Sequence, residues 1–233
     1  MSTVIELKAI TKVYNPTGIS VHALKGINLK IEKGEFTVVV GPSGSGKTTL
    51  LNIIGGLDQP TEGTVTIDGT DISTMKPDDL IDFRLNHIGF VFQSFNLIPV
   101  LTAKENVEFI MLLQNIAKAE RDERAGQILG DVGLEGRLNS TPSELSGGQQ
   151  QRVAVARALA SRPSFVLADE PTANLDSVAA ESLLEIMENL NRERSMTFVF
   201  STHDSRVMKR AHRILTLEDG LITSDKMDNV RSS

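Results

Sequence analysis

The chain has 233 residues, enough for one large α/β domain or two small ones around a sizeable core. Its formal net charge of −6 excludes the basic footprint of a nucleic-acid-binding protein, and the lack of cysteine excludes disulfides and thiolate metal sites. The sequence has neither a signal-peptide core nor an apolar run near the ~20 residues of a membrane helix. We therefore expect a cytoplasmic protein that serves a membrane, if at all, through a partner.

The first part of the chain alternates between strand and helix patterns. Loose apolar–polar alternation predicts two antiparallel strands joined by a turn at 15–18. The β-branched run "FTVVV" (36–40) is typical of a buried parallel strand, and a helix follows it and stops at the glycines 55–56. The strands predicted in this part are 4–10, 22–31, 36–40, 63–69 and 87–93.

A helical, charge-rich block interrupts this alternation between about residues 94 and 160. Strand patterns then return, with one long amphipathic helix among them. The chain after residue 222 is polar, and we expect it to be frayed. The elements predicted in this part are the strands 165–169, 197–202 and 213–218 and the helix 178–194.

The stretch "GPSGSGKT" (41–48) lies between a predicted strand and a predicted helix, which is the context that a phosphate-binding loop needs. Its glycines allow backbone N–H groups to face a β-phosphate, Lys47 supplies positive charge to the β- and γ-phosphates, and the Thr48 hydroxyl is placed to ligate Mg²⁺. The alternative is a tight turn with a chance lysine. The residues predicted to bind nucleotide here are Gly41, Pro42, Ser43, Gly44, Ser45, Gly46, Lys47, Thr48 and Thr49.

A pair of carboxylates follows the buried strand "FVLAD". Asp169 ends this strand at the edge where ligands of open α/β sheets bind, so we expect it to hold Mg²⁺ directly or through water. Glu170 is placed to orient the attacking water or to accept its proton, although it would alternatively cap the next turn. Three further polar residues are predicted to sense the γ-phosphate: Gln93, which also touches metal or water, Asp176 and His203.

The stretch "LSGGQQQR" (145–152) resembles a second phosphate cradle without a lysine. A helix starting near Gln149 offers free N–H groups and the positive end of its dipole, and Ser146 adds a hydroxyl. Such a cap suits an anion whose charge is neutralised mostly elsewhere. The alternative is a plain helix N-terminus with a flexible entry. The residues predicted to bind nucleotide here are Ser146, Gly147, Gly148 and Gln149.

The order of these motifs, together with "NLD" (174–176) and "STHD" (201–204), resembles the ATP-binding-cassette (ABC) ATPases over roughly residues 4–222. The resemblance implies an α/β fold of the P-loop NTPase (RecA-like) type, with a parallel-sheet core, an N-terminal antiparallel β subdomain and an inserted α-helical subdomain. It implies that two chains pair head to tail, with each ATP between the phosphate loop of one chain and the "LSGGQ" stretch of the other. It also implies that Tyr14 stacks on adenine, whereas the residues alone indicate only a half-exposed ring beside a turn.

The resemblance also suggests how the domain is organised. We predict a single ABC ATPase domain over residues 1–233. Its nucleotide-binding core, with the β subdomain, would comprise about 1–93 and 161–222, and its helical subdomain about 94–160. The remaining residues, 223–233, would form the polar tail.

Longer stretches such as "FVFQSFNLIPVLTAKENV" are similar to the ATPase subunits of bacterial lipoprotein-releasing, macrolide-export and cell-division systems. This similarity implies a separate integral membrane subunit, with the ATPase bound to it at the cytoplasmic face of the inner membrane. The apolar segment 94–101 suggests that Phe95, Leu97 and Ile98 form part of the docking groove. The alternative is ordinary packing of the helical block onto the core.

Three other functions compete with a transport motor. ABC ATPases of DNA repair or chromosome architecture share the "LSGG" motif but insert coiled coils or zinc modules, and this chain is compact and has no cysteine. Translation-type ABC factors carry two cassettes and a basic linker, whereas this chain has one cassette and an acidic balance. A plain nucleotide switch would not need a second cradle. We therefore expect no nucleic-acid partner.

Overall fold

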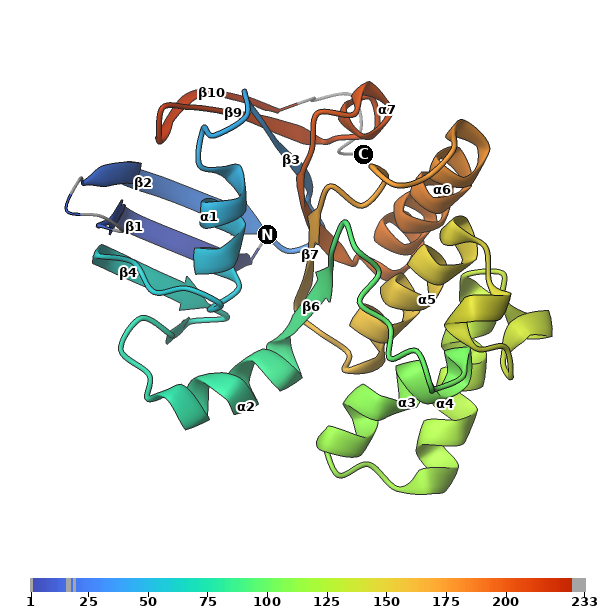
Figure 1. Cartoon of the computed structure of the whole chain (residues 1–233). Coiled ribbons are helices and arrows are strands. Elements are labelled where there is room, and N and C mark those ends of the chain that lie inside the picture. Colours follow the sequence, from blue (N-terminus) through green and yellow to red (C-terminus); the bar gives the residue numbers. More distant parts are fainter. Residues whose placement is uncertain (1, 16–17, 19, 228–233) are drawn as a thin grey trace.

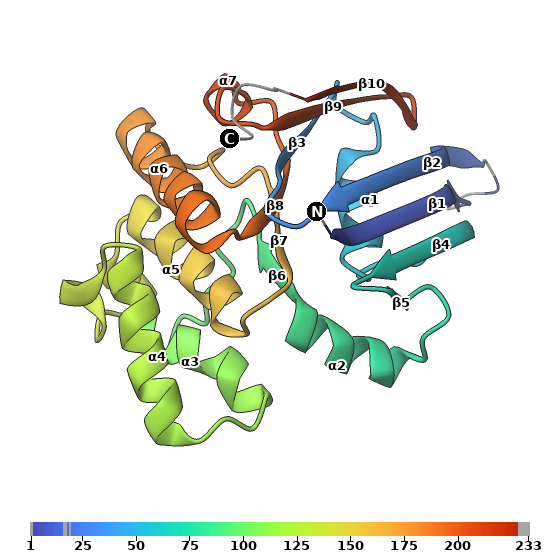
Figure 2. The same ribbon diagram turned by 180° about the vertical axis from the view of Figure 1, so that it is seen from behind.

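The computed structural model describes residues 2–15, 18 and 20–227 of the chain (Figure 1). Two β-sheets lie side by side, and most of the helices gather on the far side of the second sheet (Figures 1 and 2). In the described part of the chain, no helix is long and apolar enough to cross a membrane.

The first sheet is antiparallel and has the strand order β2-β1-β4-β5. Its two long strands pair over most of their length, with Leu7 opposite Leu29, and their alternate side chains enter the core. The predicted antiparallel β subdomain is therefore confirmed, although the turn predicted at 15–18 lies partly outside the described residues. The strands are β1 (Thr3–Tyr14), β2 (Val21–Glu32), β4 (Glu62–Ile67) and β5 (Thr70–Asp71).

The second sheet is parallel except at one edge and has the order β10-β9-β3-β8-β7-β6. Its central strands are continuous apolar runs because both of their faces are covered. Neighbouring side chains enter different cores, as Val38 and Val39 do. The strands are β3 (Phe36–Val40), β6 (Ile88–Val91), β7 (Phe165–Asp169), β8 (Thr197–Ser201), β9 (Arg213–Glu218) and β10 (Leu221–Met227).

The predicted polar tail, 223–233, lies partly outside the described residues, which end at 227. Within them the expectation of a frayed chain was wrong, because β10 continues to Met227 and pairs with β9 in antiparallel fashion. This strand is polar because it forms an exposed edge of the sheet. The guanidinium of Arg213 ties it down through the carboxylate of Asp225, with Nη2 2.7 Å from Oδ2. Polarity here indicates an edge position and not a lack of structure.

The helices separate into two groups. Helix α1 (Lys47–Ile54) lies between the two sheets and shares a core with both of them. Helices α3 (Ala103–Leu113), α4 (Lys118–Asp131) and α5 (Gly147–Ala160) pack together and, with α6 (Ser177–Arg194), build the second core on the other face of the parallel sheet. The remaining helices are α2 (Pro77–His87), α7 (Ser205–Met208) and the 3-10 turns Glu135–Arg137 and Pro142–Glu144.

Candidate nucleotide-binding site

The loop between β3 and α1 is held so tightly that two of its positions accept only glycine. Gly41 (φ 154°) and Gly46 (φ 104°) have positive φ angles, which side chains disfavour. A Cβ atom at Gly41 would lie 2.0 Å from the carbonyl oxygen of Leu217, and one at Gly46 would lie 2.5 Å from that of Ala23. The loop is therefore wedged between β9 and β2, and its backbone N–H groups are fixed before any ligand arrives.

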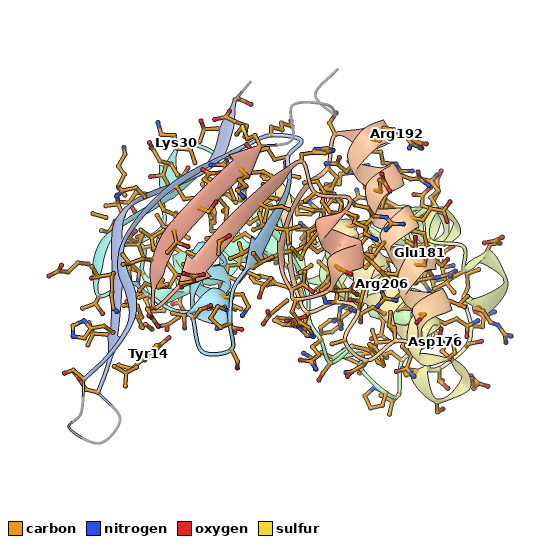
Figure 3. The ribbon with its side chains drawn as sticks, turned by 90° about the horizontal axis from the view of Figure 1, so that it is seen from above. Tyr14, Lys30, Asp176, Glu181, Arg192 and Arg206 are labelled. Atoms are coloured by element: carbon orange, nitrogen blue, oxygen red, sulfur yellow. The ribbon has the colours of Figure 1, made fainter. Side chains whose placement is uncertain are left out.

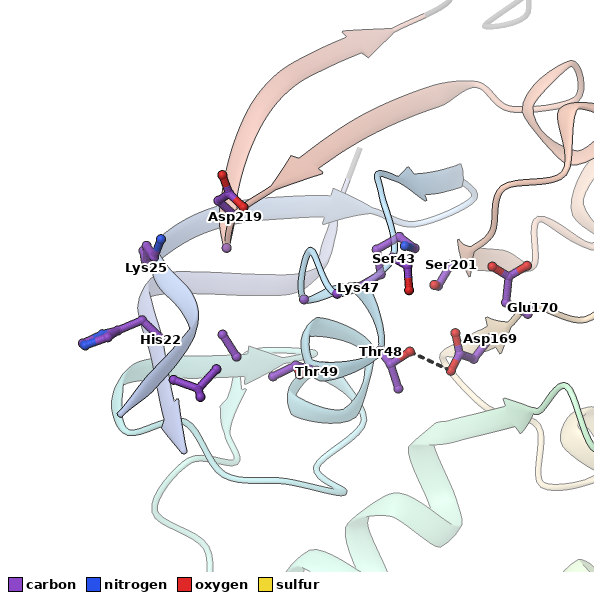
Figure 4. A pocket seen from close by; sticks show the side chains of 15 residues that line it. His22, Lys25, Ser43, Lys47, Thr48, Thr49, Asp169, Glu170, Ser201 and Asp219 are labelled. Carbon is purple, nitrogen blue, oxygen red and sulfur yellow. Dashed lines mark hydrogen bonds between the residues drawn. The ribbon is translucent and has the colours of Figure 1, made fainter. Parts of the chain in front are cut away.

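A cavity of about 410 Å³ opens beside this loop (Figure 4). The loop and the start of α1 form one side, and the ends of β7 and β8 supply Asp169, Glu170 and Ser201. Three further side chains that line the cavity are not predicted from the sequence: His22 and Lys25 on β2 and Asp219 in the turn before β10. These residues belong to no motif and reach the cavity only through the pairing of the strands.

Lys47 and Thr48 lie where the sequence predicted them. The ammonium of Lys47 donates to the carbonyl oxygens of Gly41 (2.9 Å) and Pro42 (3.0 Å) and so lies across the loop. The hydroxyl of Thr48 donates to Oδ2 of Asp169 (3.2 Å). The structure therefore brings two of the three predicted Mg²⁺ ligands into contact across 121 residues of sequence, while the third, Gln93, lies elsewhere.

The donor set around Thr48 fits a hydrated cation. Oδ1 of Asp169 and the hydroxyl oxygens of Ser45 and Ser201 are buried and have no partner among the described residues. Buried oxygens without a protein partner are unusual in a folded protein and are suited to bind a ligand or water. The described residues contain no cluster of three or more carboxylate or histidine ligands. Mg²⁺ matches this pattern, because it is usually held by one or two protein oxygens together with phosphates and water.

Glu170 lines the cavity and pairs with His203, which is exposed and does not line it. Nδ1 of His203 lies 2.8 Å from Oε1 of Glu170, and the Thr202 hydroxyl donates to Oε2 (3.0 Å). The backbone of Glu170 adopts a positive φ of 47°, fixed by the hydrogen bond from its N–H to the Ser201 carbonyl (2.8 Å). The carboxylate thus points to the end of β8, and these contacts do not support the alternative in which it caps the next turn.

The second cradle lies apart from this cavity in the single chain, and its four residues are absent from the described lining. Helix α5 begins at Gly147 and not near Gln149, with Ser146 as its N-cap. The Ser146 hydroxyl accepts from the Gln149 N–H (3.3 Å), and the Gln149 side chain accepts from the Ser146 N–H (3.0 Å). The free N–H groups expected at Gln149 are therefore those of Gly147 and Gly148, because the first N–H groups of a helix have no acceptor within it.

A sequence model described as "ABC transporter" matches residues 24–173 of the chain. The chain belongs to the ABC transporter family. Among its relatives is "Uncharacterized ABC transporter ATP-binding protein MJ0796" of Methanocaldococcus jannaschii, which is 48% identical over 226 residues (95% of this chain, 96% of that protein). Another is "Macrolide export ATP-binding/permease protein MacB" of Rhodopirellula baltica, 45% identical over 223 residues (95% of this chain, 33% of that protein). The cassette thus spans about a third of the length of the MacB relatives.

A solved structure, "Dimeric structure of a post-hydrolysis state of the ATP-binding cassette MJ0796 bound to ADP and Pi", superimposes with a TM-score of 0.88. It is 46% identical in sequence, and the alignment covers 96% of this chain and 98% of that one. The predicted fold class is confirmed, as is the assignment of the cassette to the ABC ATPases. A non-transport role in DNA repair or translation is not favoured.

In addition to the second cradle and to Gly41, Pro42, Ser45 and His203, three predicted site residues lie outside the cavity lining of the described chain: Tyr14, Gln93 and Asp176. The Gln93 side chain is exposed on the loop after β6, and its carbonyl oxygen accepts from Asn174 (3.0 Å). Asp176 is the N-cap of α6 and accepts from the Ala179 N–H (2.8 Å). Tyr14 and Asp176 lie on opposite sides of the molecule (Figure 3), so one chain does not bring them together. The roles of all three remain predictions.

Tyr14 is anchored by its hydroxyl group, which donates to Oδ2 of Asp58 (2.6 Å). Burial and this bond raise the pKa of the phenol. The ammonium of Lys12 binds the same carboxylate and lies 4.8 Å from the centre of the tyrosine ring. The ring is thus held at the end of β1 beside Thr49, a position compatible with the predicted adenine contact.

The residues predicted to dock the membrane subunit are all half-buried. Leu97 packs against the helical core, and the backbone of Ile98 is bonded at both N and O by the buried amide of Asn106 (2.8 and 3.1 Å). The ring of Phe95 faces the start of α5, 3.6 Å from the position of a Cβ atom at Gly147. Ordinary packing, the alternative considered from the sequence, describes Leu97 and Ile98 well.

Asp204 braces the segment that carries His203. Its carboxylate binds the Arg206 guanidinium (2.7 Å from Nη2) and accepts from the Thr172 hydroxyl (2.8 Å), while its own N–H donates to the Thr202 hydroxyl (3.0 Å). The Arg206 hydrogen bonds, which outweigh burial, lower the pKa of Asp204 from 3.8 to about 2. This carboxylate therefore contributes stability only while it is ionised.

We expect Asp204→Asn to cost about 2 kcal/mol of unfolding free energy at neutral pH, since a pKa shift of one unit is worth ~1.4 kcal/mol. The folded-state pKa is depressed, so this contribution is fully present above the ordinary pKa of 3.8 and is lost as the pH falls through about 2. Urea unfolding of both proteins at pH 7, 5 and 3 measures the difference. A gap between wild type and variant that does not narrow below pH 4 would contradict this account.

Proposed function

We propose that the cassette is the ATP-hydrolysing motor of an ABC transporter and that the cavity beside the 41–48 loop holds Mg²⁺–ATP. The observation that carries this proposal is that Lys47, the Thr48–Asp169 contact and Glu170, which pairs with His203, all line one cavity. A cation for phosphate, a metal position and a base for water are the three parts that phosphoryl transfer requires.

Each residue of the proposed site has one role in the reaction. Bound Mg²⁺, held by Thr48 and Asp169 with Gln93 as a further contact, would neutralise charge on the β- and γ-phosphates. Lys47 exchanges its loop carbonyls for phosphate oxygens. Glu170 orients the attacking water and accepts its proton. In its protonated form His203 donates through Nδ1 to the carboxylate and through Nε2 to the γ-phosphate.

We further propose that two cassettes enclose two ATP molecules, with the Ser146–Gln149 cradle of each chain capping the nucleotide of the other. Two facts support this arrangement: the cradle does not line the cavity of its own chain, and the solved MJ0796 relative is described as dimeric. A twofold dimer uses the same two patches at both interfaces. The cradle needs no lysine because the Lys47 of the other chain supplies the charge.

The partner whose conformation ATP hydrolysis would change is proposed to be an integral membrane permease. MacB relatives carry both words, ATP-binding and permease, in their names, and the cassette matches only about a third of their length. We propose a system of the macrolide-export or lipoprotein-release type, with the cassette bound at the cytoplasmic face of the inner membrane. The relatives' names support the class of partner and not a particular cargo.

An apolar cleft supports a proposed docking position for such a partner. A cleft of about 360 Å³ lies between α2, β6, α3 and α5, and mainly apolar side chains line it. Two of these are unusually exposed for large apolar residues, Ile81 (53%) and Leu57 (45%). We therefore shift the proposed dock from Phe95, Leu97 and Ile98 to this adjoining cleft. Its occupant would be an amphipathic cytoplasmic helix of the permease.

We expect the double variant Leu57→Asp and Ile81→Asp to fold and bind ATP but to lose the permease when complexes are purified from detergent-solubilised membranes. Charges in an apolar cleft prevent the apolar face of a helix from binding. Mass spectrometry identifies the co-purified membrane protein. Met227→Asp is the matched control, because Met227 is 60% exposed at the far edge strand.

If the double variant retains as much permease as wild type does, the cleft is not the dock. If wild type itself captures nucleic acid and no membrane protein, the transport assignment is wrong.

A further inference from the structure

The segment that follows Gln93 is fastened by side chains from other elements. Between the end of β6 at Val91 and the start of α3 at Ala103, the backbone forms neither strand nor helix. Instead, side chains of α5 and of the 170–176 loop bind its carbonyl groups. The donors are Gln151 Nε2 to Phe92 O (3.1 Å), Asn174 Nδ2 to Gln93 O (3.0 Å), and Arg157 to Phe95 O (3.1 Å) and Asn96 O.

Gln151 makes the contact that reaches furthest. Its side chain is completely buried, and its amide nitrogen donates both hydrogens, one to Phe92 O (3.1 Å) and one to Pro171 O (2.9 Å). Phe92 immediately precedes Gln93, and Pro171 immediately follows Glu170. One buried amide therefore connects the backbones next to the two residues that are proposed to contact the water and the γ-phosphate.

The Gln151 side chain is held although one of its polar atoms lacks a hydrogen bond in the described part of the chain, which indicates that the two bonds of its nitrogen are specific. Oε1 of Gln151 is buried without a partner among the described residues. A buried oxygen without a hydrogen bond is destabilising, but an apolar residue at this position would leave two backbone carbonyls unpaired instead. Gln151 lies one turn after Gly147 on α5, so the helix that begins with the second cradle also carries this amide.

We propose that Gln151 is a positioning residue for ATP hydrolysis, whose buried amide keeps Gln93 and Glu170 in register with each other and with helix α5. This inference rests on the proposed function, because it assumes that Gln93 and Glu170 act on the same phosphate. Arg157 adds a second connection from the same helix to the same segment. Burial lowers the pKa of its guanidinium, as expected for a charge that has exchanged water for carbonyl groups.

The test replaces Gln151 by methionine, which has nearly the same length and volume but donates no hydrogen bond. In Gln151→Met we expect kcat to fall about 10-fold or more, while the Kd for ATP changes by less than about 2-fold. Hydrogen exchange of the amides of residues 92–98 should accelerate in the folded variant, because the Gln151 bond to Phe92 O, one of those that hold this backbone, is gone.

Gln114→Met is the matched control. Gln114 also uses its amide to bind carbonyl groups of two elements, Leu85 O (3.4 Å) and Ser161 O (3.3 Å), and its Oε1 is likewise buried without a described partner. It lies away from Gln93 and Glu170. A merely structural amide would lower the stability of both variants equally and leave kcat per folded molecule unchanged, so a selective loss of kcat in Gln151→Met supports positioning.

Two results would overturn the proposal: an unchanged kcat in folded Gln151→Met, or unchanged exchange of residues 92–98. Weaker ATP binding at unchanged kcat would also overturn it. If Gln151→Met does not fold, Arg157→Gln replaces it, with faster exchange confined to 95–98 and a lower kcat at unchanged Kd as the expected result. If wild type hydrolyses no ATP, the proposed function fails, whereas the exchange comparison still decides whether Gln151 holds the segment.

Discussion

Glu170→Gln is expected to leave ATP binding intact and to reduce turnover roughly 10²–10⁴-fold, about 3–5 kcal/mol of activation free energy. The amide keeps the shape of the carboxylate and its contacts with Thr202 and His203 but is not a base. The substitution also removes a negative charge from beside the phosphates. The ATP-bound dimer should therefore persist, and size-exclusion chromatography with ATP and Mg²⁺ should detect it.

The same experiment tests the shared site when Gly147→Asp is added to the Glu170→Gln chain. A Cβ atom at Gly147 has room, since its nearest neighbour would lie 3.6 Å away, and an acidic residue suits the first turn of a helix. We expect the double variant to fold and to bind ATP but not to dimerise, because the carboxylate repels the γ-phosphate of the other chain. A Glu170→Gln chain that stays monomeric would count against the composite site.

Loss of ATP binding by the Gly147→Asp monomer would have a different meaning. It would show that the second cradle contacts nucleotide within its own chain. The separation of this cradle from the cavity makes that outcome unexpected.

Lys47→Ala should abolish hydrolysis and weaken ATP binding. Lys47 supplies the one cation of the 41–48 loop, and its Nζ already lies against the loop carbonyls, from which it can transfer to phosphate oxygens. Steady-state ATPase assays and equilibrium binding of ATP measure the two effects. Lys25→Ala is the comparison, because it removes one exposed positive charge from the β2 wall of the same cavity.

For Lys25→Ala we expect turnover to remain within about 10-fold of wild type, because salt and water screen an exposed charge. Near-normal turnover of the purified Lys47→Ala protein would refute the site. Equal losses in the two variants would mean that overall charge, and not the phosphate loop, determines binding.

The sequence predicts the strands whose apolar residues match their burial. It misses the elements that bury few apolar side chains. Strands β3, β7 and β8 are covered on both faces and read as apolar runs. Helix α2 was not predicted, because it buries only Leu80 and shows little apolar periodicity. Strand β10 was taken for a frayed tail because an edge strand has no need of an apolar face.

The candidate site shows the same division. The sequence predicts that Thr48 and Asp169 hold the metal, and the structure places them in contact. It assigns Glu170 to the attacking water and His203 to the γ-phosphate as separate roles, and the contact between these two side chains is seen only in the structure. It did not predict His22 or Lys25, which reach the cavity through strand pairing. The buried amide of Gln151 was also missed, since its role depends on two loops far away in the sequence.

The pairing of Ser146 with Gln149 in the single chain bears on how easily two cassettes separate. Each satisfies the backbone N–H group of the other, and these two bonds can persist when a phosphate arrives, because the Ser146 hydroxyl can still donate its hydrogen and the N–H groups of Gly147 and Gly148 are free in the described chain. Each new bond to phosphate replaces a bond to water and is worth only about 1–3 kcal/mol net. Once the γ-phosphate has left, the cap is still in place, and the freed groups bond to water again at little cost. A cradle that is stable without phosphate favours separation of the two cassettes, and repeated cycles of hydrolysis require separation as well as binding.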